Sequence, residues 1–156
     1  MPESMKSKLW RWAFNLYPTY RSTGAWVTYV AHDFREVRVK LPLSWRTRNY
    51  VGTIFGGSMY AAVDPFYMIM LIKNLGPGYV VWDKAAAIRF KKPGRGTLFA
   101  RFVFADEELN TIRSELQRLT SLDRVYEIQL TNAEGLACAV VEKTIYIRRK
   151  VSDSKA

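Results

Sequence analysis

Residues 49–64 read NYVGTIFGGSMYAAVD, and they begin the most apolar segment of the chain. From Gly57 to about Asn74 the sequence is apolar on every side with few polar interruptions, which is typical of a helix surrounded by protein. About 18 residues at a rise of about 1.5 Å span about 27 Å, enough to cross a whole sheet. Because a proline removes a helical hydrogen bond, Pro65 predicts a bend directly after Asp64.

Asp64 is the feature of this stretch that points to function. A carboxylate within an apolar segment is costly to bury without a compensating partner, so we look for the site here. Its neighbours Val63, Phe66 and Tyr67 predict partial desolvation, which would make Asp64 a stronger base than a solvated carboxylate. A purely structural role, paired with Lys84 or Arg89 across a subunit interface, is the alternative.

Strand patterns lie on both sides of the apolar helix. The segments 25–30 and 35–41 predict two antiparallel strands, 79–90 and 97–104 predict a long hairpin, and 124–131 and 136–149 predict another. A surface helix is expected over 106–119, with Asp106 as N-cap and an apolar stripe of Leu109, Ile112, Leu116 and Leu119. Six strands with grouped helices predict the α+β class.

The N-terminal residues 3–16 predict an amphipathic helix that ends before Pro18. Its apolar stripe consists of Met5, Leu9, Trp12 and Leu16. We expect this stripe to pack against the protein's own sheet. The alternative is contact with a membrane surface, because the helix also carries lysines and tryptophans.

The 156 residues, 49% of them hydrophobic, fit one domain over residues 1–150 with an N-terminal helical extension at 1–20. Residues 151–156 are expected to be a disordered tail. The single Cys138 lies in an apolar run and is expected to be a small buried hydrophobe, which weakly favours a reducing, cytoplasmic setting. One cysteine and one distant histidine do not supply a zinc or iron–sulfur site, so no metal is expected.

The formal net charge of +10 favours an anionic partner. Residues 84–101 contain six basic residues and no acidic one, a pattern that suits a polyphosphate ligand but is equally typical of a solvated basic face. No nucleic-acid-binding motif accompanies the charge, so a specific nucleic-acid partner is not expected.

The pattern Asn49, then Phe55-Gly56-Gly57, then Asp64, followed by the basic segment 84–96, resembles the hotdog-fold acyl-CoA thioesterases, especially the phenylacetyl-CoA thioesterase-like branch. The resemblance covers about residues 25–148. The helix at 106–119 and the Asp-Pro step look more like an uncharacterised family of that superfamily. The resemblance implies a hotdog fold, in which an antiparallel sheet of about six strands wraps a long central helix.

The resemblance also implies residue roles. Asp64 corresponds to the catalytic carboxylate, acting as general base or nucleophile. Gly56 corresponds to the residue whose backbone N–H polarises the thioester carbonyl, and Asn49 to the side chain that orients water or substrate. The substrate-binding candidates are Phe55, Gly57, Tyr60, Arg89, Lys91, Lys92 and Arg95, the last four for the phosphates of coenzyme A.

Geometry adds a condition to these roles. Eight residues of helix place Asp64 about 12 Å from Gly56 along the axis, too far for both to reach one carbonyl and its attacking water. Hotdog subunits pair with their sheets side by side, so the resemblance implies a homodimer, with a tetramer as a further option, in which two chains share a site. No cofactor is expected apart from the coenzyme A of the substrate.

Phe55 departs from the superfamily pattern, which has histidine at this position. Three functions stay open: an acyl-CoA thioesterase, which we favour; a non-catalytic acyl-CoA- or lipid-binding hotdog protein; and, ranked last, a nucleic-acid or membrane-surface binder suggested by the net charge and the N-terminal helix. For individual residues, Asn49 could simply satisfy a turn, and Gly56 and Gly57 could serve only close packing.

Overall fold

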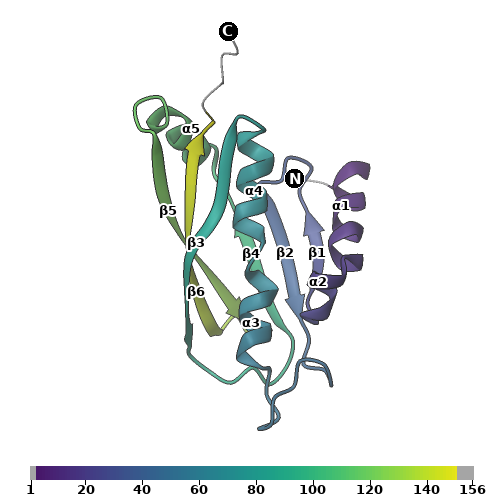
Figure 1. The fold of residues 1–156 in the computed structure, drawn as a ribbon. Helices are drawn as coiled ribbons and strands as arrows, with labels where there is room; N and C mark the ends of the chain where they lie inside the picture. Colours follow the sequence, from purple (N-terminus) through teal and green to yellow (C-terminus); the bar gives the residue numbers. More distant parts are fainter. Residues whose placement is uncertain (1–2, 151–156) are drawn as a thin grey trace.

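We describe residues 3–150 of the chain in a computed structural model, which forms one antiparallel six-stranded sheet and five helices over that range (Figure 1). The strands are β1 (Trp26–Val30), β2 (Glu36–Leu41), β3 (Tyr79–Phe90), β4 (Leu98–Val103), β5 (Ser121–Thr131) and β6 (Ala137–Arg149). The helices are α1 (Met5–Leu16), α2 (Pro18–Ser22), α3 (Gly56–Val63), α4 (Phe66–Leu75) and α5 (Asp106–Glu115). The expected disordered tail lies outside the described residues.

The strand order in the sheet is β1-β2-β4-β5-β6-β3. The two antiparallel strands predicted at 25–30 and 35–41 are confirmed as β1 and β2, which pair with each other, and the predicted β5–β6 hairpin is confirmed. The predicted hairpin of β3 with β4 is wrong, because β3 pairs with β6 and β4 lies between β2 and β5. The segment between them forms no tight turn: the Ile54 N–H donates to the Gly94 carbonyl at 2.9 Å, which holds this segment beneath the start of α3.

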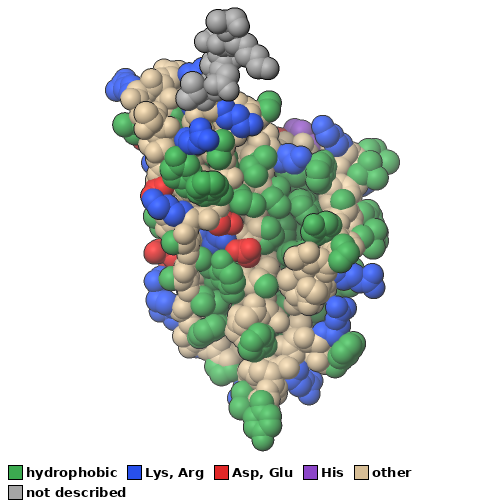
Figure 2. All heavy atoms as spheres, in the orientation of Figure 1, with side chains coloured by type: hydrophobic (Ala, Val, Ile, Leu, Met, Phe, Trp, Pro, Cys, Tyr) green, Lys and Arg blue, Asp and Glu red, His purple; other side chains and the backbone are tan. Residues whose placement is uncertain are grey.

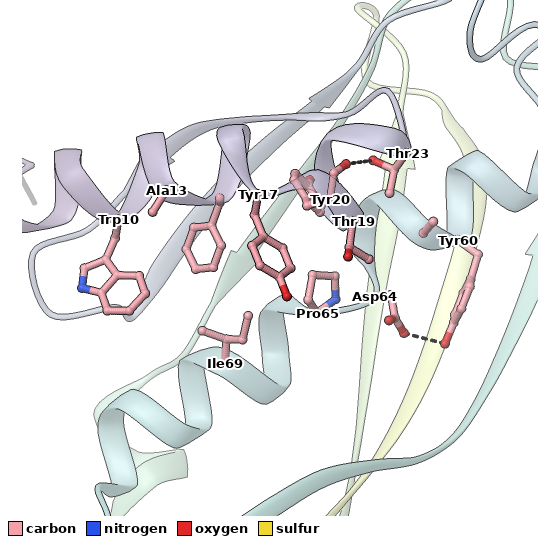
Figure 3. A pocket seen from close by; sticks show the side chains of 12 residues that line it. Trp10, Ala13, Tyr17, Thr19, Tyr20, Thr23, Tyr60, Asp64, Pro65 and Ile69 are labelled. Carbon is pink, nitrogen blue, oxygen red and sulfur yellow. Dashed lines mark hydrogen bonds between the residues drawn. The ribbon is translucent and has the colours of Figure 1, made fainter.

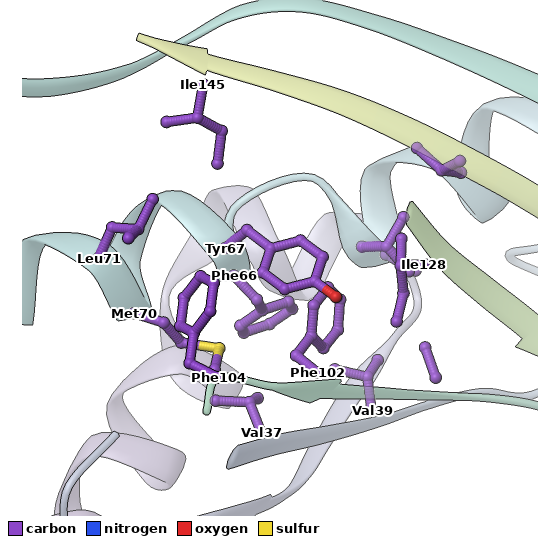
Figure 4. Close-up of a cluster of buried hydrophobic side chains, with 14 of the residues drawn as sticks. Val37, Val39, Phe66, Tyr67, Met70, Leu71, Phe102, Phe104, Ile128 and Ile145 are labelled. Carbon is purple, nitrogen blue, oxygen red and sulfur yellow. The ribbon is translucent and has the colours of Figure 1, made fainter. Parts of the chain in front are cut away.

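The central helix crosses the sheet as two segments, α3 and α4, and the expected interruption at Pro65 is confirmed (Figure 1). Near this interruption the Tyr20 hydroxyl donates to the Ala62 carbonyl at 3.0 Å. The concave face of the sheet packs against the helix through aromatic side chains, among them Phe66 and Phe102, whose ring centroids lie 5.2 Å apart (Figure 4). Burial of these large rings supplies much of the stability of the fold. Cys138 is buried in the same core, as expected.

Helix α1 covers β1 at the edge of the sheet, but the predicted contact face is wrong. The Asn15 side chain accepts from the Val27 N–H at 2.8 Å and donates to the Val27 carbonyl at 2.9 Å, which fixes the helix against β1. Trp10 and Phe14 pack on the core from the same side. Because this opposite face makes the contacts, the predicted stripe of Met5, Leu9, Trp12 and Leu16 points to solvent. Within residues 3–150 no helix is both long enough and apolar enough to cross a membrane.

Helix α5 is shorter than predicted and is capped differently. Ala105 is the N-cap, and Asp106 is the first helical residue, with its carboxylate paired to Arg35. An acidic residue in the first turn still complements the helix dipole. Leu109, Ile112 and Leu116 are buried as predicted, whereas Leu119 is exposed because the helix ends at Glu115.

Candidate functional site

A cluster of four charged and polar side chains lies where the central helix meets β3 and β6. The Lys143 Nζ atom contacts the Asp64 Oδ1 atom at 2.5 Å, the Asp64 carbonyl oxygen at 2.9 Å and the Asp83 Oδ2 atom at 3.1 Å. The Tyr60 hydroxyl donates to Asp64 Oδ1 at 2.6 Å. One ammonium therefore holds two carboxylates, and one of these also accepts from a phenol.

The sheet positions both Lys143 and Asp83. Lys143 occupies an inward position of β6, on the same face as Val141, Ile145 and Ile147, and its side chain is only 1% exposed. An irregularity in the β3–β6 register follows Asp83, which itself lies opposite Ile145. Such bulges re-aim side chains, and here the local backbone directs the Asp83 carboxylate at Lys143.

The electrostatics of the cluster come from competition between burial and pairing. Burial alone lowers the pKa of Lys143, but the contacts with Asp64 and Asp83 outweigh it, so the pKa is raised and the ammonium stays charged. Burial raises the pKa of the Asp83 carboxyl against the opposing effect of Lys143. Asp83 Oδ1 is buried and has no hydrogen-bond partner within the described residues. Such an atom is costly to leave unpaired.

Asp64 lies at one end of an apolar pocket with a volume of about 450 Å³ (Figure 3). The pocket lies between α1 and α2 on one side and the central helix on the other. The side chain of Asp64 is 42% exposed. Its wall is formed by Trp10, Ala13, Phe14, Tyr17, Thr19, Tyr20, Thr23, Tyr60, Ala61, Asp64, Pro65 and Ile69. A largely apolar cleft with a few convergent polar groups is typical of small-molecule sites.

A second pocket, of about 420 Å³, lies at the other end of α3. Asn49, Gly56, Phe90, Lys91 and Lys92 are among the residues that line it. The two pockets are separate, so within one chain Gly56 and Asp64 face different cavities.

Gly56 is the first residue of α3, and its N-cap, Phe55, makes no side-chain capping hydrogen bond among the described residues. The first N–H groups of a helix are free to bind an acceptor when no cap occupies them. A β-carbon at Gly56 would lie 2.6 Å from the Phe90 ring. A side chain at this position would displace the exposed Phe90 ring at the end of β3.

The family model described as "Domain of unknown function (DUF4442)" matches residues 6–147. The chain belongs to the DUF4442 family. No curated protein sequence matches it.

Solved structures share the fold of this DUF4442 domain. A Pseudomonas aeruginosa protein of unknown function, named "Probable Thioesterase", superposes with a TM-score of 0.81 at 17% identity and covers 96% of this chain and 99% of its own. A Haemophilus influenzae thioesterase gives a TM-score of 0.68 at 14% identity, covering 97% of this chain and 96% of its own. A Staphylococcus aureus thioesterase variant gives a TM-score of 0.59 at 14% identity, covering 82% of this chain and 96% of its own. The DUF4442 domain therefore has the hotdog fold, as the resemblance implied.

The residues predicted for the site are spread over several places in the DUF4442 domain. Asp64 and Tyr60 line the first pocket, and Asn49, Gly56, Lys91 and Lys92 line the second. Phe55, Arg89 and Arg95 are exposed. Gly57 packs against Phe55, whose ring would lie 2.3 Å from a β-carbon at that position.

Asn49 already has several contacts within its own loop. Its side-chain oxygen accepts from the N–H groups of Val51 and Thr53, and its amide nitrogen donates to the Thr53 hydroxyl. These bonds organise the turn that precedes Gly56. Its proposed action on water or substrate stays a prediction.

Within one chain Asp64 pairs with neither Lys84 nor Arg89, and their pairing with Asp64 across a subunit interface stays a prediction. Lys84 pairs with Asp123 at 2.6 Å, and Arg89 lies 3.5 Å from Glu127. The partner of Asp64 is Lys143, so the surroundings of this carboxylate are an ion pair and a phenol in addition to the apolar residues expected from sequence.

Lys143 and Asp83 were missed as members of the site. The signal for Lys143 lies in its strand, where inward positions alternate with outward ones and a lysine falls on the inward set. A lysine at such a position needs a buried acidic partner. No comparable pattern identifies Asp83, because the register irregularity that directs it inward appears only in the folded sheet.

Proposed function

We propose that this protein is an acyl-CoA thioesterase of the cytoplasm that hydrolyses the thioester bond of an acyl- or aryl-CoA. The observation that carries the proposal is the position of Asp64, a half-exposed carboxylate at the end of an apolar pocket. An acyl chain in that pocket brings its carbonyl carbon to the carboxylate. The thioesterases among the solved structures of similar fold support the same reaction class.

In the proposed reaction Asp64 accepts a proton from water while the water oxygen bonds to the carbonyl carbon. The tetrahedral intermediate then collapses, the carbon–sulfur bond breaks, and the proton passes to the departing thiolate of coenzyme A. Tyr60 and Lys143 hold Asp64 in place through their contacts with Oδ1. The products are a carboxylic acid and free coenzyme A.

The negative charge that develops on the carbonyl oxygen needs a donor, for which we propose the Gly56 N–H of a second copy of the chain. Within one chain Gly56 lines a different pocket from Asp64. Strand β3 ends the sheet, and its outer edge is unpaired within the described part of the chain. Such an edge is a template for another strand. A homodimer through β3 therefore unites the two half-sites.

Coenzyme A carries phosphates that need cationic partners. Lys91 and Lys92 line the pocket that contains Gly56, which places their charges beside the proposed oxyanion donor. Arg89 and Arg95 are exposed nearby in sequence and complete the set of candidates. We propose that this basic group binds the nucleotide end of the substrate.

Hydrolysis of a panel of acyl- and aryl-CoAs by wild type and Asp64→Asn tests the proposal. We expect the wild type to release free coenzyme A and Asp64→Asn to lose at least about a hundredfold in kcat, because general base catalysis contributes about 10²–10⁴-fold. The matched control is Asp123→Asn, an exposed carboxylate paired with Lys84, which should keep wild-type rates. Equal rates for wild type and Asp64→Asn would refute the mechanism.

A second function is favoured by one observation: Phe55 lies at the position where the superfamily pattern has a histidine, and its exposed ring has no hydrogen-bonding group. This favours an acyl-CoA-binding hotdog protein without catalysis. Saturable binding of acyl-CoA by calorimetry, with no coenzyme A released across the panel, would identify this function.

A further inference from the structure

The outer face of α1 carries a continuous apolar stripe that nothing in the described chain covers. We call the four side chains Met5, Leu9, Trp12 and Leu16 the outer stripe; their exposed fractions are 76%, 67%, 53% and 61%. These residues recur at spacings of four, three and four, so they lie on one side of the helix. Large apolar side chains that are contiguous and exposed mark an interaction surface.

Lysines flank the outer stripe on both sides. With about 100° of rotation per residue, Lys6 lies about 100° from Met5 in one direction and Lys8 about 60° in the other. Both lysines are exposed. Figure 2 shows hydrophobic and basic side chains side by side along the edge of the molecule formed by α1. This arrangement lets each lysine extend along the helix and place its charge beside the stripe.

The inner face of α1 is fixed, so the outer stripe is presented to whatever lies outside. Asn15 is bonded to the backbone of β1 through both of its polar atoms. Glu3 accepts from the Val30 N–H at 3.1 Å and from Arg11 at 3.0 Å, which holds the start of the helix to the same strand. The helix is not free to rotate and bury the stripe in its own core.

We propose that the outer stripe binds the surface of an anionic lipid bilayer. A helix with a basic border and a Trp- and Leu-bearing apolar face lies in the interface between headgroups and acyl chains. The net charge of +10 attracts the whole molecule to such a surface. Nucleic acid offers no apolar layer for four exposed hydrophobic side chains. Lipid binding by the outer stripe does not depend on thioester hydrolysis, so the two proposals are tested by different experiments.

Vesicle flotation measures the binding directly. We expect wild type to float with vesicles of phosphatidylcholine mixed with phosphatidylglycerol, and far less with phosphatidylcholine alone. Lys6→Gln/Lys8→Gln should lower the partition coefficient on the order of 20-fold on anionic vesicles, because each lysine contributes about fivefold. Leu9→Ser/Trp12→Ser should lower it on the order of a hundredfold, because two large apolar side chains no longer enter the bilayer.

Matched controls distinguish binding through the outer stripe from nonspecific binding through net charge or exposed apolar side chains. Lys40→Gln/Arg118→Gln removes the same charge from exposed positions elsewhere, and Leu119→Ser removes an exposed leucine beyond α5. Both controls should bind as wild type does, and thermal unfolding should be unchanged in all exposed-site variants.

Two results would overturn the proposal: no binding of wild type to anionic vesicles, or equal binding by wild type and Leu9→Ser/Trp12→Ser. Sedimentation of wild type without lipid adds a third. Concentration-dependent association that Leu9→Ser/Trp12→Ser abolishes, in a protein that does not float, would assign the outer stripe to contact between copies of the chain.

Discussion

Lys143 neutralises two carboxylates from inside the sheet, and its side chain is almost completely buried. Removal of one partner of a buried ion pair is expensive because the remaining charges lose their compensation. In Lys143→Met, Asp64 and Asp83 would face each other without a cation. Solvent weakens the repulsion between these two carboxylates, because Asp64 is half-exposed.

We therefore expect Lys143→Met to lower the free energy of unfolding by about 3 kcal/mol, at the lower end of the range for broken buried pairs. Chemical denaturation at neutral pH measures this. The double variant Asp83→Asn/Lys143→Met should regain part of the loss, because one of the uncompensated carboxylates is gone. A loss below about 1 kcal/mol for Lys143→Met would contradict this role of the cluster.

Buried tyrosines make the fold sensitive to alkali. Burial raises the pKa of Tyr67 to about 12 and also raises the pKa values of Tyr20 and Tyr126. In the unfolded chain a tyrosine ionises at about pH 10. Because the folded state keeps the proton that the unfolded state releases, stability falls as pH rises above about 10. Lys143 acts in the same direction, since its raised pKa gives stability that is present at lower pH and lost in alkali.

The prediction is a steeper loss of unfolding free energy between about pH 10 and 12 in wild type than in Tyr67→Phe. The phenylalanine keeps the ring packing but has no proton to release. Denaturation curves at a series of pH values measure the two slopes. Identical slopes would mean that Tyr67 titrates alike in the folded and unfolded chain.

Helices α1 and α2 form one wall of the pocket that ends at Asp64. Ala13 lies on this wall, so Ala13→Phe should fill part of the pocket (Figure 3). We expect the KM for long acyl-CoAs to rise on the order of tenfold, because each methylene excluded from the pocket forfeits about 0.8 kcal/mol. Short acyl-CoAs should be affected less.

Ala133→Phe, in the exposed loop between β5 and β6, is the control and should leave all KM values unchanged. If Ala13→Phe changed KM equally for acyl-CoAs of all chain lengths, the acyl chain would not bind in this pocket.

The sequence predicted the elements better than their contacts. Hydrophobic periodicity identified the strands and the broken central helix, because local burial patterns report them directly. The prediction of a β3–β4 hairpin was wrong, because strand pairing depends on contacts between distant parts of the chain, such as that of Ile54 with Gly94. The face of α1 was wrong for a similar reason: two hydrogen bonds from Asn15 to β1 outweigh the more regular apolar stripe.

For the candidate site, the sequence spacing predicted that Gly56 and Asp64 lie far apart within one chain, because the helix rise sets that distance. The structure agrees, since the two residues line different pockets. The partners of Asp64 were not predictable to the same degree. Lys143 lies 79 residues away along the chain, and only the β3–β6 pairing and the position of the central helix bring it to Asp64.

The proposed active site needs two copies of the chain. A symmetric dimer contains two equivalent sites, each with Asp64 from one copy and Gly56 from the other. Gly56→Val should disable the donor end, because its side chain would meet the Phe90 ring. In a heterodimer of Asp64→Asn and Gly56→Val chains, one site holds both substitutions and the other is intact.

The most direct measurement is acyl-CoA hydrolysis by an equimolar mixture of these two variants after dissociation and reassembly. Each variant alone should be inactive, and the mixture should recover about one quarter of wild-type activity, because half of the randomly assembled dimers carry one intact site of two. Differently tagged chains that copurify establish that heterodimers form. If those heterodimers are present and release no coenzyme A, the site is not shared between subunits.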